Sequence, residues 1–346
     1  MVDVRTIDAA NGRDSAAWDA FVASRPEATF FHRAGWQRVI REAAGHGCPY
    51  LLAERADEPV GVLPLTLVKS PVFGRRLVST GFCVHGGPLA ADADAQAALL
   101  DRARTIAADN GAACVEYRCA LPETPDRAVR GGQHANFSKP ISADNDANMK
   151  AIPRKQRAMV RKGLNFGLTS RADQDIATCY RVYAESVRNL GTPVFPRALF
   201  RELLAAFPEE SEVTTVETDD GTPLASVLSF LFRDTVLPYY GGGTTAARRW
   251  AANDVMYWEV MRRAADRGFK RFDFGRSKVG SGAYSFKKNW GFPPEPLSYS
   301  FDLVTADAPP DLSPANPKFA RATRLWQRLP LGVANALGPW IAKDLA

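Results

Sequence analysis

The fold is decided by four consecutive segments: SEVTTVETDDGTPLASVLSFLF (211–232), RDTVLPYYGGGT (233–244), NDVMYWEVMRRAADRG (253–268) and FKRFDFG (269–275). The first places two runs of β-forming residues around Asp-Asp-Gly, which predicts a hairpin. The second predicts a strand that ends in glycines. The third has apolar residues at helical spacing before a terminal glycine, which predicts an amphipathic helix. The fourth predicts a further strand, so this part of the chain is expected to form a mixed sheet covered by helices.

The first half of the chain repeats the same order with different residues. Its segments are YLLAERADEPVGVLPLTLV (50–68), RRLVSTGFCVHGGPLA (75–90), AQAALLDRARTIAADNGA (95–112) and ACVEYRCA (113–120). They predict two strands around an Asp-Glu-Pro turn, a strand that ends at a double glycine, a helix and a strand. Duplication is the simplest explanation. We therefore expect an α/β (α+β) fold of two tandem domains, each a mixed, mostly antiparallel sheet flanked by helices.

The expected domains span residues 1–147 and 148–305, because a polar and then basic linker follows residue 141. Residues 306–346 form a tail that is first rich in proline and then amphipathic. We expect the tail to pack back on a domain. The alternative is contact with a membrane surface, since Trp326 and Trp340 stand among apolar residues beside Lys318, Arg321, Arg324 and Arg328.

Composition limits the class of protein. The 346 residues are 46% hydrophobic and 24% charged, which is typical of folded enzymes and binding proteins and argues against long disorder. The net charge of +6 favours anionic partners such as phosphorylated precursors, RNA or a membrane surface, and we expect no DNA partner. The N-terminal residues resemble no signal peptide, and no stretch is apolar enough to span a bilayer. A cytoplasmic protein is expected, with peripheral contact at the inner membrane face as an alternative through the tail.

The cysteines and histidines do not point to a metal centre. There are five cysteines without a C-x-x-C pair and four histidines, none of them at the spacing of metal ligands. We expect neither a metal site nor a resident cofactor. Buried, reduced thiols are the simplest reading of the cysteines.

The segment richest in candidate site residues is DFGRSKVGSGAYSFKKNWGF (273–292), which leaves the carboxyl end of a predicted strand. An acyltransferase stabilises an oxyanion when an amine attacks a carbonyl, and basic side chains suit that task. Lys287 or Lys288 would stabilise this charge. Substrate phosphate or carboxylate would be held by Arg276 and Lys278, with Tyr284 on the same face as the two lysines. The alternative is a solvated basic loop.

Upstream residues are expected at the same edge of the sheet. Asp254 is a candidate to accept the proton of the incoming amine, although capping of the helix explains it equally well. Tyr240 is a candidate to hydrogen-bond the carbonyl, with core packing as its alternative. Tyr239 and Arg248 are further candidates for substrate binding.

A basic helix is predicted in AIPRKQRAMVRKG (151–163), from Pro153 to Gly163. Helical spacing places Arg154, Arg157 and Arg161 on one face, with Lys155 and Lys162 beside them. Five positive charges without an acid favour RNA phosphates or an anionic precursor as the ligand. A solvated linker helix is the alternative.

Several of these segments resemble the FemAB family, specifically its branch associated with exosortase (PEP-CTERM) and exopolysaccharide loci. The segments are VFPRALFRELLAAF (194–207), PYYGGGT (238–244), FDFGRS (272–277) and AYSFKKNWGF (283–292), together with FFHRAGWQRVI (30–40), VGVLPLTLVKSPVFGRRLVS (60–79) and HGGPLA (85–90). The resemblance extends over nearly the whole chain. It implies two GNAT-like domains and an aminoacyltransferase that transfers an aminoacyl group from tRNA to an amine on a peptidoglycan or exopolysaccharide precursor, forming a peptide bond.

The resemblance also implies roles for single residues. Lys287 matches the lysine of the family's F-K-x-x-[FW]-G segment and would stabilise the developing charge, while Arg276 and Ser277 match polar positions at the strand end. The chain lacks the long helical arm that helps some members hold tRNA. It also lacks the Gly-rich turn that holds the CoA pyrophosphate in CoA-dependent GNAT enzymes, since TTAARRWAAND (244–254) contains no glycine.

The acyl donor, aminoacyl-tRNA or acyl-CoA, therefore stays open, and so does the acceptor, an anionic or sugar-containing envelope precursor. Two other functions remain as alternatives. One is a CoA-dependent N-acyltransferase. The other is a non-catalytic GNAT-like protein that binds the envelope-polysaccharide machinery.

Overall fold

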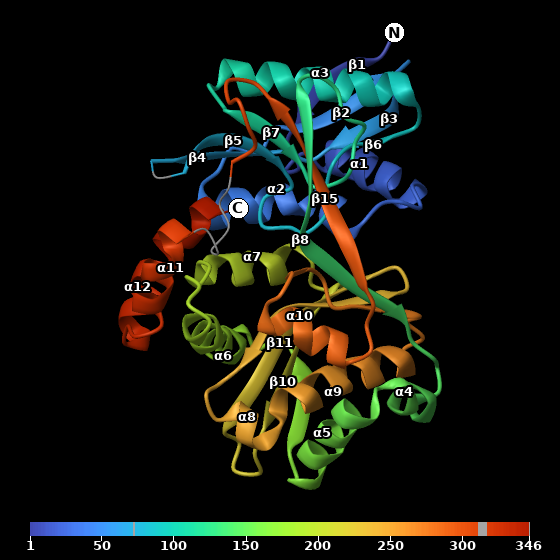
Figure 1. Ribbon diagram of the computed structural model, residues 1–346. Coiled ribbons are helices and arrows are strands. Elements are labelled where there is room, and N and C mark those ends of the chain that lie inside the picture. The colour runs from blue at the N-terminus through green and yellow to red at the C-terminus, as the bar shows by residue number, and fades with distance from the viewer. Residues whose placement is uncertain (72, 311–316, 346) are drawn as a thin grey trace. The chain divides into compact units, whose positions relative to one another are not determined.

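The fold is taken from a computed structural model, which describes residues 1–71, 73–310 and 317–345 (Figure 1). The chain forms two compact units. Unit 1 contains Met1–Gly132, Leu297–Asn316 and Trp340–Ala346, and unit 2 contains Gln133–Pro296 and Pro317–Pro339. The division into domains at 147/148 and 305/306 stays a prediction. Within the predicted tail, residues 311–316 and 346 lie outside the described residues.

The strands of unit 1 fall into two groups. The antiparallel sheet has the order β1-β2-β3-β6, and the second group has the order β4-β5-β7-β15, in which β5 and β7 are parallel. The strands are β1 (Asp3–Ile7), β2 (Tyr50–Arg55), β3 (Glu58–Leu63), β4 (Thr66–Ser70), β5 (Gly74–Ser79), β6 (Leu89–Ala90), β7 (Cys114–Tyr117) and β15 (Pro294–Leu303), whose last seven residues belong to this unit. The helices are α1 (Gly12–Ser24), η1 (Phe30–His32), α2 (Gly35–Ala44) and α3 (Ala93–Asp109).

The predicted hairpin of unit 1 is present as β2 and β3. Its turn is formed by Ala56 and Asp57, both at positive φ, one residue earlier than expected. After β3 comes Pro64, which has no N–H to donate to a ladder, and the next strand pairs in the other group. The predicted stretch 50–68 therefore contributes strands to two groups.

Unit 2 contains one mixed sheet with the order β8-β13-β12-β11-β10-β9. Only β12 and β13 are parallel neighbours, and the other neighbouring strands on this path are antiparallel. This confirms the mostly antiparallel sheet expected from the sequence. The strands are β8 (Arg127–Pro140, shared with unit 1), β9 (Thr169–Asp173), β10 (Ser211–Glu217), β11 (Pro223–Phe232), β12 (Thr235–Gly243) and β13 (Arg271–Asp273), with the short β14 (Ser277–Lys278) paired to β8.

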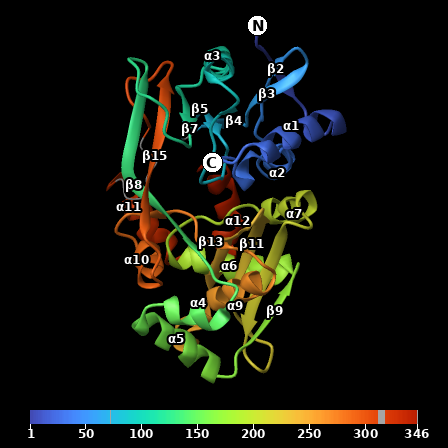
Figure 2. The same ribbon diagram turned by 90° about the vertical axis from the view of Figure 1, so that its right-hand side faces the viewer.

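Helices cover both faces of this sheet. Helices α6 (Ile176–Asn189) and α7 (Arg197–Ala206) lie against one face, and α9 (Ala252–Asp266) lies against the other. The alternation of β11 explains the division, because Ala225 and Val227 join the core under α9 while Leu228 points to the α6 face. The remaining helices of unit 2 are α4 (Asn145–Ala151), α5 (Arg154–Asn165), α8 (Ala247–Trp250) and α10 (Gly282–Asn289); Figure 2 shows α4, α5 and α9 near one another.

Two predicted helix ends are corrected. Helix α5 continues to Asn165, because Gly163 lies inside it at the crossing with α9. A Cβ added at Gly163 would overlap the Val255 side chain of α9 and lie 3.1 Å from the Trp250 carbonyl oxygen just before that helix, so glycine permits the close approach of the two helices. Helix α9 is preceded by Ala251 at φ 53°, and no side chain caps it. The capping role considered for Asp254 is therefore wrong, and its carboxylate is used elsewhere.

The last part of the chain is helical. It contains α11 (Pro317–Trp326), α12 (Leu331–Ala342) and η2 (Lys343–Leu345). The Arg188 guanidinium donates to the Gln327 carbonyl, and the Gln327 side chain donates to the Asn189 carbonyl, which joins this segment to the end of α6. Among the described helices, none is both long and apolar enough to cross a membrane.

Candidate functional site

The ammonium group of Lys287 is held by three backbone carbonyls. It lies in α10 and donates to the carbonyl oxygens of Phe274 at 2.7 Å, Gly275 at 3.0 Å and Arg276 at 3.0 Å. These residues form the turn that leaves β13, where Gly275 has φ 66°. Because a lysine ammonium has three N–H donors, all of them are engaged in this conformation. Lys287 thus fastens α10 to the end of the strand.

The surroundings of the Lys287 ammonium are aromatic, and the residue as a whole is half-buried. Its Nζ lies 5.6 Å from the centre of the Phe137 ring and 5.9 Å from that of Phe274. Burial lowers the pKa of Lys287 to about 7, although the Asp273 carboxylate nearby acts in the opposite direction. Protonation of this amine therefore changes near neutral pH.

The structure separates the neighbouring candidates. Lys288 is exposed, so only Lys287 of the two lysines reaches the strand end. Tyr284 packs edge-to-face on Phe137 with ring centres 5.2 Å apart and is thereby close to the same aromatic surface. The candidates Ser277 and Lys278 form β14 and pair with β8, where Ser277 is buried.

Asp254 accepts two hydrogen bonds inside unit 2. The Trp290 indole N–H donates to its Oδ1 at 3.1 Å, and the Gln156 amide donates to the same oxygen. Burial raises the pKa of Asp254, and the two hydrogen bonds oppose this effect. A carboxylate in the first turn of α9 connects α5, α9 and the end of α10. Sequence reasoning missed Gln156, because it stands 98 positions away from its partner.

Tyr240 does not join Lys287 and Asp254. It pairs with Leu228, and its ring lies in an aromatic cluster with Tyr183 and Phe200, at 6.0 and 5.2 Å between ring centres. The period of two along β12 directs it to the face covered by α6 and α7, whereas Asp254 starts the helix on the opposite face. Tyr240 and Asp254 thus lie on opposite faces of the sheet, and a shared role with Lys287 stays a prediction.

Two other upstream candidates lie near this strand. Tyr239 packs against Tyr240, with ring centres 4.7 Å apart. Arg248 is exposed on the short helix α8, which follows β12 after the three glycines.

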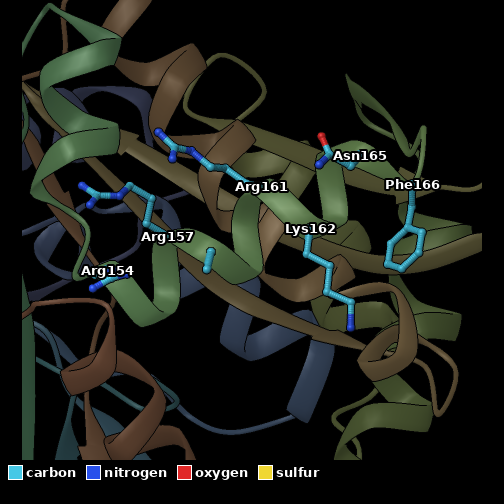
Figure 3. Close-up of a pocket in the computed structure, with 7 residues that line it drawn as sticks. Arg154, Arg157, Arg161, Lys162, Asn165 and Phe166 are labelled. Carbon is cyan, nitrogen blue, oxygen red and sulfur yellow. The ribbon is translucent and has the colours of Figure 1, made fainter.

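A cationic hollow lies along α5 (Figure 3). It has a volume of about 550 Å³ and is lined by Arg154, Arg157, Ala158, Arg161, Lys162, Asn165 and Phe166. Three predicted polyanion-binding residues thus share one concave surface, as their spacing indicated. Lys155 is exposed but is not among the residues that line the hollow.

Aromatic rings extend this basic surface, a feature that sequence reasoning missed. Phe166 meets Trp250 edge-to-face at 5.2 Å, and Lys162 lies over the Phe166 ring at 5.8 Å. Arg249 lies over Trp250 at 5.2 Å. Phe166 is 44% exposed, so part of an apolar ring is available beside the cations. The signal in the sequence was an aromatic residue directly after the basic helix.

The described residues contain no group of three or more His, Cys, Asp or Glu side chains that could hold a metal ion.

Comparison with known proteins relates this geometry to one fold. Residues 147–288, which include α5, Asp254 and Lys287, match the family described as "Acetyltransferase (GNAT) domain". This stretch has a GNAT-like fold. A comparison with curated proteins gives no match.

Solved structures extend the likeness over most of the chain. FemX is 16% identical, with 87% of this chain and 98% of that chain covered at a TM-score of 0.65. A tandem GNAT protein from the clavulanic acid biosynthesis pathway is 13% identical, with 90% and 100% covered at 0.55. L-PGS from Bacillus licheniformis is 13% identical, with 94% and 99% covered at 0.55. These identities show the fold alone, and that fold is GNAT-like, consistent with the tandem arrangement expected from the duplication.

Proposed function

We propose that the protein is an acyltransferase that forms an amide bond by transferring an aminoacyl group to an amine on a cell-envelope precursor of the peptidoglycan or exopolysaccharide pathway. The observation that carries the proposal is the match of residues 147–288 to a GNAT acetyltransferase domain. The likeness of the fold to FemX and to a tandem GNAT protein supports it. The sequence resemblance to the exosortase-associated FemAB branch suggests the acceptor.

In the proposed reaction, the acceptor amine attacks the carbonyl carbon of the donor ester, a C–N bond forms and the C–O bond to the leaving group breaks. The amine loses a proton, and the leaving oxygen gains one. Burial makes Asp254 a stronger base than an exposed carboxylate, which suits proton acceptance. Lys287 would stabilise the oxyanion by exchanging one carbonyl bond for the substrate oxygen.

The start of α9 supports an aminoacyl donor over acyl-CoA. A helix N-terminus binds pyrophosphate through free N–H groups and a positive dipole end. Here the first turn of α9 already contains the buried carboxylate of Asp254, and α5 packs against the Trp250 and Ala251 carbonyls through Gly163. A pyrophosphate at this position would meet a negative charge.

The hollow on α5 supports a phosphate-bearing ligand. Arg154 and Arg161 are seven residues apart, about 10 Å along the helix axis, so one ligand with several phosphates can reach both. Arg157 lies between them, and its guanidinium is held in place by the Lys150 carbonyl at 2.9 Å. We assign the hollow to the anionic part of the donor or the acceptor.

Transfer of label from charged tRNA and from acyl-CoA to amine-bearing envelope precursors tests the proposal. We expect transfer from charged tRNA, with a rate roughly 100-fold lower in Lys287→Ala. The matched control is Lys288→Ala, which removes an exposed lysine from the same helix and should retain the wild-type rate.

Other results of this assay would refute parts of the proposal. Transfer from acyl-CoA alone would refute the aminoacyl donor and support the alternative of a CoA-dependent N-acyltransferase. If neither donor supports transfer while the precursor still binds, the protein is a non-catalytic binding protein. A salt series with an Arg154→Gln, Arg157→Gln, Arg161→Gln variant tests the hollow, because loss of three phosphate contacts should reduce the salt dependence of binding.

A further inference from the structure

Helix α12 packs on unit 2 through small residues. Ala334 is 1% exposed, and Gly338 lies against the backbone of Val194. A Cβ added at Gly338 would lie 2.9 Å from the Val194 amide nitrogen, so a side chain at this position would not fit against the neighbouring backbone. The small residues Ala334 and Gly338 therefore form the side of α12 that packs within unit 2.

The large apolar residues of the same helix are exposed. Val333 is 43% exposed, Leu337 49%, Trp340 70% and Ile341 38%. Their positions i, i+4, i+7 and i+8 place them along one side of the helix. In an ordinary surface helix this side would be polar, and exposed apolar stripes of this kind mark contact surfaces.

Basic residues accompany the apolar stripe without acids. Between Pro317 and Lys343 the sequence contains no Asp or Glu. Arg321, Arg324 and Arg328 are exposed along and just beyond α11. Next to the stripe, the Lys343 ammonium lies 5.2 Å from the centre of the Trp340 ring.

We propose that α11 and α12, with their exposed arginines and the stripe from Val333 to Ile341, bind the surface of an anionic lipid membrane. Such a surface provides negative headgroups for the arginines and an apolar layer for the stripe, and Trp340 suits the boundary between the two. The absence of acids from this segment removes the repulsion that acidic side chains would cause. The segment can thus lie on a membrane that none of the described helices crosses.

Co-sedimentation of the full chain with lipid vesicles tests this proposal. One set of vesicles contains phosphatidylcholine only, and the other also contains phosphatidylglycerol. We expect binding to the second set that weakens with salt. Replacing Arg321, Arg324 and Arg328 with Gln should lower the partition coefficient about 100-fold, since each basic residue near an anionic surface contributes about fivefold. Replacing Leu337 and Trp340 with Ser should lower it roughly tenfold or more.

Matched controls separate this surface from general charge and hydrophobicity. Arg13, Lys69 and Arg102, all exposed, are replaced with Gln to remove the same number of charges elsewhere. Leu164→Ser with Val279→Ser removes apolar residues that are 37% and 47% exposed. Both controls should bind vesicles like the wild type.

Three results would overturn the proposal. The first is equal binding to both kinds of vesicle. The second is loss of binding in the controls to the same extent as in the tail variants. The third is a self-associating wild type that the Leu337→Ser, Trp340→Ser variant converts to a monomer without any change in vesicle binding, which would assign the stripe to contact between copies of the chain. Thermal unfolding of each variant verifies that it is folded.

Discussion

Replacing Lys287 with Met removes three hydrogen bonds while keeping an unbranched side chain of similar length. The carbonyls of Phe274, Gly275 and Arg276 lose their donor in a largely buried place. At roughly 1 kcal/mol for each bond, the free energy of unfolding should fall by about 3 kcal/mol below pH 7, where the amine is protonated and has three N–H donors. Lys288→Met is the matched control, because this exposed lysine is the next residue in the same helix.

The lowered pKa of Lys287 also predicts how its contribution to the free energy of unfolding changes with pH. Burial lowers the pKa of Lys287 in the folded state from 10.5 to about 7, so between these values the unfolded state binds more protons than the folded state. The contribution of Lys287 to stability should therefore rise with pH across this window, by at most about 1.4 kcal/mol per pH unit, and stay constant below it. Urea denaturation followed by tryptophan fluorescence measures this difference between wild type and variant. A difference that falls between about pH 7 and pH 10, or an unchanged stability of Lys287→Met, would refute the reasoning.

Three further predictions concern the same unit. Gly163→Ala should lower the stability by about 1 to 2 kcal/mol, because overpacking between α5 and α9 outweighs the gain in helix propensity; a rise in thermal midpoint would contradict this. The stability of Asp254→Asn should rise relative to that of the wild type as pH rises above 4. A raised carboxyl pKa means that the folded wild type binds more protons than the unfolded state, so the wild type loses stability as the pH rises; denaturation at several pH values measures the trend. Tyr240→Phe should keep the transfer rate of the wild type, because the Tyr240 side chain lies on the face covered by α6 and α7. A 100-fold loss of rate would instead indicate that the hydroxyl takes part in the reaction.

Local patterns predicted much of unit 2 correctly. Turn residues and alternating apolar residues located β10, β11 and β12, and helical spacing with a terminal glycine located α9. These features depend on neighbours within a few residues, so the sequence contains the information directly. The same reasoning placed Arg154, Arg157 and Arg161 on one face of α5, where the structure shows the cationic hollow.

The end of α5 shows where local rules fail. Gly163 resembles a terminal glycine, yet its lack of a Cβ serves contact with α9, almost a hundred residues later in the chain. Asp254 likewise resembles a capping residue, because it stands at the start of the predicted helix. The donors of its two hydrogen bonds are Gln156 in α5 and Trp290 at the end of α10. Both are distant in the sequence, so no local spacing predicts these contacts.

By itself, the sequence determined the duplicated order of strands and helices, the basic face of α5 and the presence of Lys287 in a glycine-rich and aromatic segment. Only the tertiary structure decided that Lys287 turns back to three carbonyls, that Asp254 is buried in a network, and that Tyr240 faces the opposite side of the sheet. The physical reason is that periodicity defines the faces of a helix or strand, whereas the partner of each face is selected by packing between elements distant in the chain.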